Sequence, residues 1–261
     1  MCNWLLLLSY DGFNYHGWQV QKHHNTIEAE LEKAIATITR KVASVFGAGR
    51  TDAKVHALNQ TASFFSDANL SSEKWRAALN AVLPEDIVIK YVLKVSSDFH
   101  ARHSSTAKFY RYLIYNKPYP NPFANHYSWW IRKPLDVTAM QQAAQYFIGE
   151  YDFSAFRSSQ CSSLSPVKSV HKLIVYPLNT SIASLCIEIK ANSFLQHMVR
   201  IIVGTLVAVG QHRFLPNSIP GIINSHDRTQ SGKTAPPYGL YVLQVEYNNH
   251  DIQWPSDVLD F

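Results

Sequence analysis

The chain is poor in cysteine and in charged residues, and its apolar runs are short. Three cysteines, an odd number without paired spacing, favour neither a disulfide framework nor a zinc site. The apolar runs at residues 4–8 and 201–209 fall far short of the roughly 20 residues that a bilayer span needs. The first run also lacks the basic region and the cleavage site of a secretory signal. We therefore expect a cytoplasmic protein.

Acidic residues are scarce in two long stretches. Residues 99–135 hold six Lys or Arg and no Asp or Glu, and residues 153–226 hold six against the single acid Glu188. The net charge of +5 is therefore unevenly distributed. Such stretches favour a polyanion as partner, although a solvated basic surface has the same composition.

The remaining composition is that of a folded protein. Charged residues make up 16% and hydrophobic residues 46%, which argues against disorder and is enough for a sizeable core. The order of the predicted elements indicates an α+β protein of two similar βαββαβ halves, ferredoxin-like or RRM-like, with antiparallel sheets covered by helices. We place the halves at residues 1–105 and 106–261, with the active-site cleft between them.

Hydrophobic periodicity and turn residues predict the elements of each half. In the first half, Asn25 is expected to cap a helix with Glu28 in a capping box, and Gly149 is expected to end a helix in the second half. The predicted strands are 4–10, 43–46, 58–65, 87–95, 109–115, 172–176, 184–190 and 241–247. The predicted helices begin at about Thr26, after Ser71 or Ser72, after Asp136, and at about Ser193.

Reactive side chains are densest at residues 47–57, Gly-Ala-Gly-Arg-Thr-Asp-Ala-Lys-Val-His-Ala. The carboxylate of Asp52 lies two residues from the guanidinium of Arg50, in a loop whose glycines permit a sharp turn. An adjacent cation keeps an aspartate ionised, which suits a nucleophile or a general base. A turn aspartate held by local hydrogen bonds would fit the same position.

Residues 48–56 resemble the signature of the TruA-type tRNA pseudouridine synthases. Similar segments follow the same order from residue 10 to residue 247, and so cover nearly the whole chain. They are Tyr10-Asp11-Gly12 with Gly17-Trp18-Gln19, Asp98-Phe99-His100-Ala101-Arg102 before Tyr110-Arg111-Tyr112, Asn192-x-Phe194-x-x-His197-Met198-Val199-Arg200-x-Ile202-Val203-Gly204, and Gly239-Leu240-Tyr241.

The resemblance implies catalytic roles for three matched residues. Asp52 corresponds to the essential aspartate, and Arg200 to the basic residue that pairs with it. Tyr110 corresponds to a tyrosine that stacks on the target base and is implicated in handling its proton. Two residue properties bear on these roles. A charge such as Arg200 in an apolar helix is costly unless it is paired, whereas Tyr110 on a strand also fits a structural core position.

Further matched residues are assigned to substrate binding. Arg50 corresponds to an arginine implicated in displacing the target nucleotide, and Leu240 to an apolar residue near the base. His100 and Arg102 lie in the matched central segment. His100 and His103 have a spacing that could suggest a metal site, but no Cys or carboxylate completes it.

The activity implied by the resemblance is isomerisation of uridine to pseudouridine at positions 38–40 of the tRNA anticodon stem-loop. The resemblance also implies a homodimer in which one tRNA contacts both subunits, and a reaction without cofactor or metal. The essential carboxylate either attacks the sugar or removes its proton, and the sequence leaves both routes open. Two alternatives are a non-catalytic tRNA-binding or folding protein with the same cleft, and a nucleotide hydrolase. The hydrolase would need metal ligands or a second catalytic carboxylate, which we do not find.

Lys54 departs from the family pattern, which usually has glycine at this position. A glycine there either holds a positive φ or lets the RNA backbone come close. In the first case Lys54 strains the loop, and in the second it crowds the ligand. Its ammonium could instead add a phosphate contact. We expect the change to be tolerated.

Overall fold

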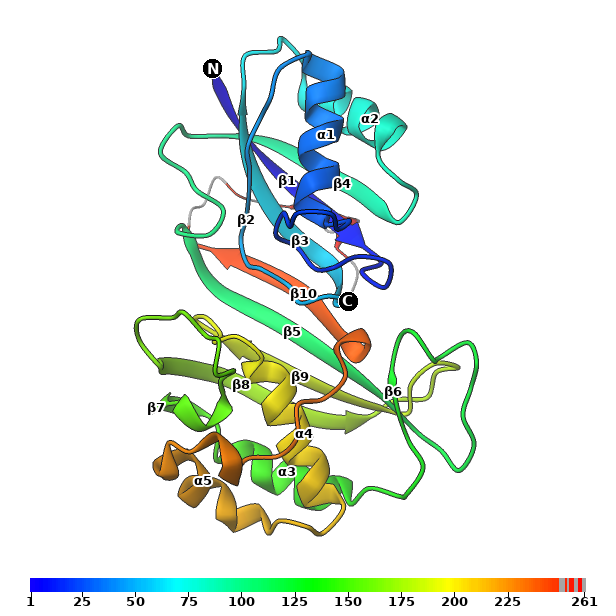
Figure 1. Ribbon diagram of the computed structural model, residues 1–261, viewed down its shortest axis with the longest axis vertical. Coiled ribbons are helices and arrows are strands. Elements are labelled where there is room, and N and C mark those ends of the chain that lie inside the picture. The colour runs from blue at the N-terminus through cyan, green and yellow to red at the C-terminus, as the bar shows by residue number, and fades with distance from the viewer. Residues whose placement is uncertain (249–251, 253, 256–257, 260–261) are drawn as a thin grey trace. The chain divides into compact units, whose positions relative to one another are not determined.

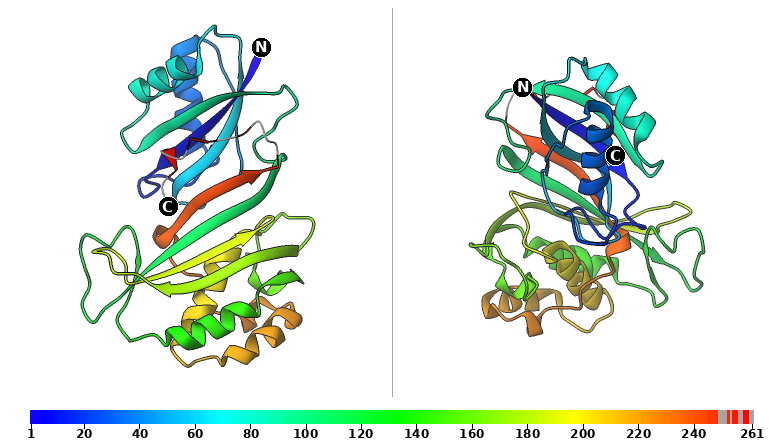
Figure 2. Two further views of the ribbon diagram at one scale, coloured as in Figure 1. Left: turned by 180° about the vertical axis from the view of Figure 1, so that it is seen from behind. Right: turned by 45° about the horizontal axis from the view of Figure 1, so that its top comes forward.

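The computed structural model describes residues 1–248, 252, 254–255 and 258–259 (Figures 1 and 2). The chain packs into two compact units, one formed by Met1–Thr106 with the chain from Tyr241 on, and one formed by Ala107–Leu240. Among the described residues, no helix combines the length and the hydropathy needed to span a membrane.

The first unit contains a mainly antiparallel sheet in the order β4-β1-β3-β10, with β2 also paired to β3. Its long apolar strand β1 is buried almost throughout, as the sequence predicts. Strand β10 pairs in parallel with β3. The bounds are β1 Cys2–Tyr10, β2 Val45–Gly47, β3 His56–Ser66, β4 Ile87–Val95 and β10 Leu240–Tyr247.

Helices α1 (Ile27–Thr39) and α2 (Ser72–Val82) lie side by side on one face of this sheet (Figures 1 and 2). Trp75 of α2 is fully buried and packs edge-on against Phe64, with ring centroids 5.1 Å apart. The side chain of Ser71 accepts a hydrogen bond from the Lys74 N–H at 3.3 Å, which confirms the predicted cap.

The second unit contains the sheet β5-β9-β8-β7, antiparallel throughout, with β6 paired in parallel to β5. Helices α3 and α4 pack against each other, and α3 packs on β8. The bounds are β5 Ser105–Asn116, β6 Trp129–Ile131, α3 Val137–Gln145, β7 Gly149–Asp152, β8 Val167–Pro177, β9 Leu185–Ala191, α4 Met198–Gly210 and α5 Ile219–Ser225, with short 3-10 turns η1 Ser154–Phe156, η2 Pro216–Ser218, η3 Arg228–Gln230 and η4 Pro237–Gly239.

Helix α4 is buried nearly all round, as its apolar sequence predicts. It begins at Met198 rather than at Ser193. Gly204 lets another segment cross the helix closely, since a Cβ there would lie 1.7 Å from the carbonyl oxygen of Lys233. The α+β class with sheets covered by helices is therefore confirmed.

Two predicted caps are wrong. Thr26, not Asn25, is the N-cap of α1, and its side chain makes no capping hydrogen bond. The carboxylate of Glu28 instead accepts a hydrogen bond from the Val20 N–H at 2.8 Å. Gly149 begins β7 with a φ of 130°, and the cap of α3 is Tyr146.

The predicted halves are residues 1–105 and 106–261. The last strand, β10, falls in the second of these ranges but packs in the first unit. Tyr241 and Val242 pair with His56 and Ala57, so this strand belongs to the first unit. The chain therefore leaves the first unit, forms the second and returns.

Candidate active site

The aspartate loop, residues 48–55, connects β2 to β3 in the first unit. Its start is fixed to β3, because the Ala48 N–H donates to the Thr61 carbonyl at 2.9 Å and the Gln60 amide donates to the Gly49 carbonyl at 3.2 Å. Asp52 is half-buried and Arg50 is exposed. The loop thus holds the carboxylate within reach of solvent on a framework anchored to the sheet.

Thr51 is the buried anchor of this loop. Its hydroxyl shares a hydrogen bond of 2.9 Å with the Tyr10 hydroxyl, and its carbonyl accepts from the Trp18 N–H at 3.0 Å. Burial raises the pKa of Tyr10 to about 12, despite hydrogen bonds to Thr51 and Gln60. The Tyr10 phenol is therefore neutral near pH 7 and stays available as a hydrogen-bonding partner.

Gly17 explains why a second motif accompanies the aspartate loop. Its φ of 94° favours glycine, and a Cβ there would lie 2.6 Å from the Thr51 carbonyl oxygen and 3.1 Å from the Asp52 carbonyl carbon. Only a residue without a side chain permits this approach. The Gly17-Trp18 segment therefore supports the main chain that carries Asp52.

Lys54 adopts the left-handed conformation, with a φ of 67°. Its N–H donates to the Tyr15 carbonyl at 3.2 Å, and its Nζ lies 4.9 Å from the ring centroid of Phe13. The position therefore has the positive φ that favours glycine. Lys54 fills it with backbone strain that a cation–π contact partly offsets.

His56 closes the loop as a buried packing residue. Its Nδ1 lies 3.0 Å from Oδ1 of Asp11, and its ring stacks on Tyr241 with centroids 4.8 Å apart. Asp11 belongs to the turn after β1, so a residue of a matched segment holds the C-terminal end of the aspartate loop.

His100 and Arg102 also lie in the first unit. The His100 ring is 5.1 Å from Phe46 and 4.4 Å from His103, and its Nδ1 accepts from the Arg102 N–H at 3.1 Å. Burial, then the charges of His103 and Arg102, lower the pKa of His100. Among the described residues, no group of three or more His, Cys, Asp or Glu side chains is placed to hold a metal.

Tyr110 lies on β5 of the second unit, opposite Ile189 of β9. Its ring is 8% exposed and packs edge-on against Phe194, with centroids 5.1 Å apart and planes at 87°. Phe194 lies in the segment that leads into α4. The matched aromatic residue is therefore in direct contact with the segment that leads into the matched helix.

Arg200 lies in the first turn of α4 and is half-buried. Its Nε donates to the Ala235 carbonyl at 2.8 Å, while the Ala235 N–H donates to the Arg200 carbonyl at 3.0 Å. The segment that passes closely over Gly204 thus orients this guanidinium. Leu240 follows at the start of β10 and is buried.

The predicted site residues divide between the two units. The first unit carries Asp52 and Arg50 with His100 and Arg102, and the second carries the remaining three, Tyr110, Arg200 and Leu240. The pairing of Arg200 with Asp52 and the stacking of a base on Tyr110 stay predictions.

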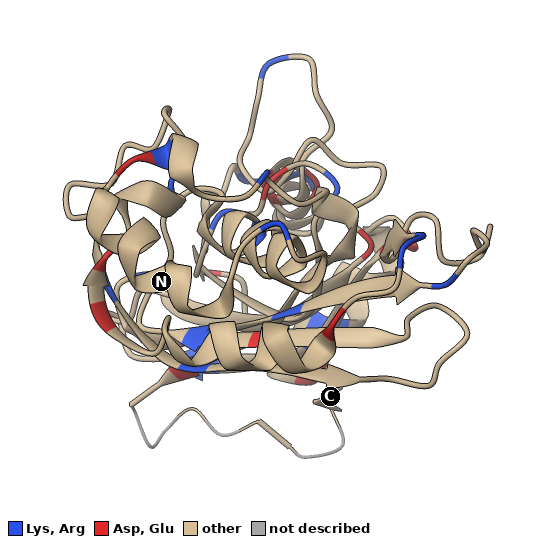
Figure 3. Cartoon of the chain, turned by 90° about the horizontal axis from the view of Figure 1, so that it is seen from below, with Lys and Arg blue, Asp and Glu red and all other residues tan. Residues whose placement is uncertain are grey.

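Lys and Arg residues are spread over helices, strands and loops rather than confined to one element (Figure 3). Glu188, the single acid of the stretch 153–226, accepts from Arg111 Nε at 3.1 Å and Nη2 at 2.8 Å, and lies 3.9 Å from Lys172 Nζ. Composition therefore overstates the free positive charge, because two cations share this buried carboxylate.

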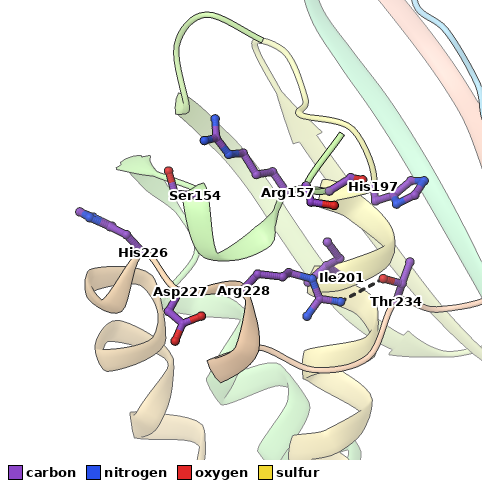
Figure 4. A pocket seen from close by; sticks show the side chains of 10 residues that line it. Ser154, Arg157, His197, Ile201, His226, Asp227, Arg228 and Thr234 are labelled. Carbon is purple, nitrogen blue, oxygen red and sulfur yellow. Dashed lines mark hydrogen bonds between the residues drawn. The ribbon is translucent and has the colours of Figure 1, made fainter. Parts of the chain in front are cut away.

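A hollow of about 620 Å³ in the second unit was not predicted (Figure 4). In the sequence, only the acid-poor stretch 153–226 indicated a basic region here. It lies beside the N-terminal end of α4 and between η1 and η3 (Figure 4). The ten lining residues are Ser154, Arg157, Ser158, Ser159, His197, Ile201, His226, Asp227, Arg228 and Thr234.

Comparison with known proteins agrees with this arrangement of motifs. The family model described as tRNA pseudouridine synthase matches residues 7–104 and 143–248. The chain belongs to the tRNA pseudouridine synthase family. It is 44% identical to tRNA pseudouridine synthase A of a Thermoanaerobacter species and 46% identical to that of Caldicellulosiruptor saccharolyticus, in each case over 95% of this chain and all of the relative. It is 41% identical to that of Coxiella burnetii, over 92% of this chain and 91% of the relative.

Proposed function

We propose that this member of the tRNA pseudouridine synthase family isomerises uridine to pseudouridine in the anticodon arm of tRNA, at positions 38–40, with Asp52 as the essential carboxylate. The observation that carries the proposal is the aspartate loop. It presents a half-buried carboxylate on a main chain that is anchored through Thr51 and supported by the close approach of Gly17.

The chemistry suits this set of residues. The reaction breaks the bond between N1 of the base and the sugar, turns the base and rejoins it through C5. C5 loses a proton and N1 gains one, so no electron or external group is required. We infer that Asp52 acts at the sugar, either by attacking its anomeric carbon or by removing a proton, and that Arg200 keeps the carboxylate ionised.

Access to the base sets the remaining requirement. Taking a uridine out of its stack costs a few kcal/mol, and stacking on an aromatic ring returns about 1–3 kcal/mol. We assign this ring to Tyr110, with Leu240 as an apolar contact of the base. Arg50, exposed beside Asp52, is assigned to displacement of the nucleotide, and His100 and Arg102 are assigned to the RNA backbone.

The decisive variant is Asp52→Asn. We expect no pseudouridine on unmodified tRNA, mapped by sequencing, and tRNA affinity within a few-fold of the parent, because the change removes a charge but little volume. Asp67→Asn is the matched control, since this exposed carboxylate pairs with Lys41, and it should keep full turnover. Retained turnover in Asp52→Asn would refute the assignment of the carboxylate.

The runner-up function is tRNA binding or folding without catalysis. It predicts tight tRNA binding by the parent protein without any product, and the same mapping assay decides between the two. We further propose a cytoplasmic homodimer in which one tRNA contacts both subunits. Sedimentation should then give the mass of two 29.7 kDa chains.

A further inference from the structure

The hollow in the second unit has positive charge that carboxylates do not neutralise by direct contact. Arg228 donates from Nη1 to Ser231 Oγ and from Nη2 to Thr234 Oγ1, each at 3.0 Å, so its partners are neutral hydroxyls. Burial lowers the pKa of this guanidinium, as expected for a cation without a counter-ion. Within the described part of the chain, neither Arg157 nor Arg228 forms a salt bridge.

Asp227 lines the hollow, and Asp152 lies within electrostatic reach of Arg157; both carboxylates have local hydrogen-bond partners. Asp227 accepts from the Thr229 N–H at 2.8 Å and from its hydroxyl at 2.7 Å, and the Arg228 side chain extends away from it toward Thr234 (Figure 4). Asp152 accepts from the Ser154 N–H at 2.8 Å. The arginines of the hollow therefore keep donors for an external anion.

The other lining groups fit an anion that carries several acceptor oxygens. Ser154, Ser158 and Thr234 contribute hydroxyls. The N-terminal end of α4 adds partial positive charge beside His197. The lining contains no Phe, Tyr or Trp on which a base could stack. Such a surface recognises a phosphate by charge and hydrogen bonds, without reading sequence.

We propose that this hollow, defined by Arg157 and Arg228, binds a backbone phosphate of the RNA substrate. The inference rests on the proposed function, because RNA is the source of the phosphate. The two arginines of the hollow lie outside the matched family motifs, Arg157 directly after η1 and Arg228 in η3, whereas His197 of the lining belongs to one of them. The role of the hollow is to hold the RNA in register while Asp52 acts at the sugar of the target uridine.

The test measures tRNA affinity as a function of salt for the full-length protein. Each phosphate contact contributes about 0.9 to the slope of log affinity against log salt concentration. We expect Arg157→Gln to lower that slope by about 0.9 and Arg157→Lys to restore most of it. Arg228→Gln should act in the same way, but Arg228 also bridges two hydroxyls, so its thermal unfolding is measured alongside.

Arg213→Gln is the matched control, because Arg213 is exposed and follows the opposite, C-terminal end of α4. It should alter the slope less than Arg157→Gln. Suppose that the parent binds tRNA and forms pseudouridine, and that folded Arg157→Gln has the same salt slope as the parent. Phosphate binding at the hollow is then refuted, whereas the proposed function is left intact. If the parent neither binds tRNA nor forms product, both proposals fail.

Inorganic phosphate separates the two sources of the anion. At constant ionic strength, phosphate should compete with tRNA weakly, and calorimetry should show weaker phosphate binding in Arg157→Gln than in the parent. If phosphate binds the hollow tightly while the salt slope for tRNA is the same in parent and variant, the hollow is a free-phosphate site and the proposal is wrong.

Discussion

Lys54 places a long side chain where the backbone favours glycine, and this predicts an unusual order of stabilities. A left-handed conformation costs an L-residue about 1–2 kcal/mol, and the φ of Lys54 is 67°. The contact of its Nζ with the Phe13 ring, at 4.9 Å, returns about 0.5–1 kcal/mol at an exposed site. Substitution by alanine removes the contact and keeps the strain, whereas glycine removes both.

The expected free energies of unfolding follow from these contributions. Lys54→Ala should be less stable than the parent by about 0.5–1 kcal/mol. Glycine recovers the strain of about 1–2 kcal/mol, but its freer unfolded chain costs about 0.4–1 kcal/mol. Lys54→Gly should therefore exceed Lys54→Ala by about 1 kcal/mol and lie close to the parent.

This difference can be measured by urea unfolding, with tryptophan fluorescence as the readout. Trp18 is fully buried, and its backbone N–H donates to the carbonyl of Thr51 in the aspartate loop. Arg76, exposed in the interior of α2, is the control position, because there glycine should be less stable than alanine by about 1 kcal/mol. The claim of backbone strain at Lys54 would be refuted if Lys54→Gly and Lys54→Ala were equally stable while glycine was less stable than alanine at Arg76.

Two further predictions concern groups outside this loop. Glu188→Gln should lower the free energy of unfolding by about 3 kcal/mol in urea titrations, because it leaves the partly buried guanidinium of Arg111 without its counter-charge; unchanged stability would show that the pair contributes little. His100 should titrate by NMR below its usual pKa, and His103→Gln should raise the pKa by removing a neighbouring positive charge. Since unfolded His100 takes up its proton at higher pH than the folded form, its contribution lowers stability as pH falls below about 6.5; a loss that is the same in His100→Gln would contradict this.

Long periodic segments were predictable because their own residues determine them. Strand β4 has the predicted bounds, Ile87–Val95, and α2 has one of the two predicted caps, Ser71. Strand β6, strand β7 and helix α5 were missed. They span three, four and seven residues, too few for a periodic pattern to emerge.

The residues of the candidate site could be predicted from the sequence, but the contacts that hold them in place could not. The motif identified Asp52, and the departure at Lys54 raised the question of a positive φ, which the backbone answers. Neither periodicity nor the motif indicated that Tyr10 would share a hydrogen bond with Thr51, or that Gly17 would touch the main chain at Asp52. These contacts join residues more than thirty positions apart, and spacing along the chain carries no information on them.

The return of the chain to the first unit is the clearest case of such non-local order. Tyr247 of β10 shares a hydrogen bond of 2.6 Å with Thr61 of β3 and donates at 2.9 Å to the carbonyl of Ala101, which follows β4. A further bond of 2.9 Å runs from the Asn59 amide to the Leu243 carbonyl. The strand that carries the aspartate loop into the sheet therefore gains these partners only after the whole second unit has been synthesised. The first four residues of β10 are all buried, so an alternation of buried and exposed side chains does not define its register there. The polar bonds between β3 and β10 supply that information instead.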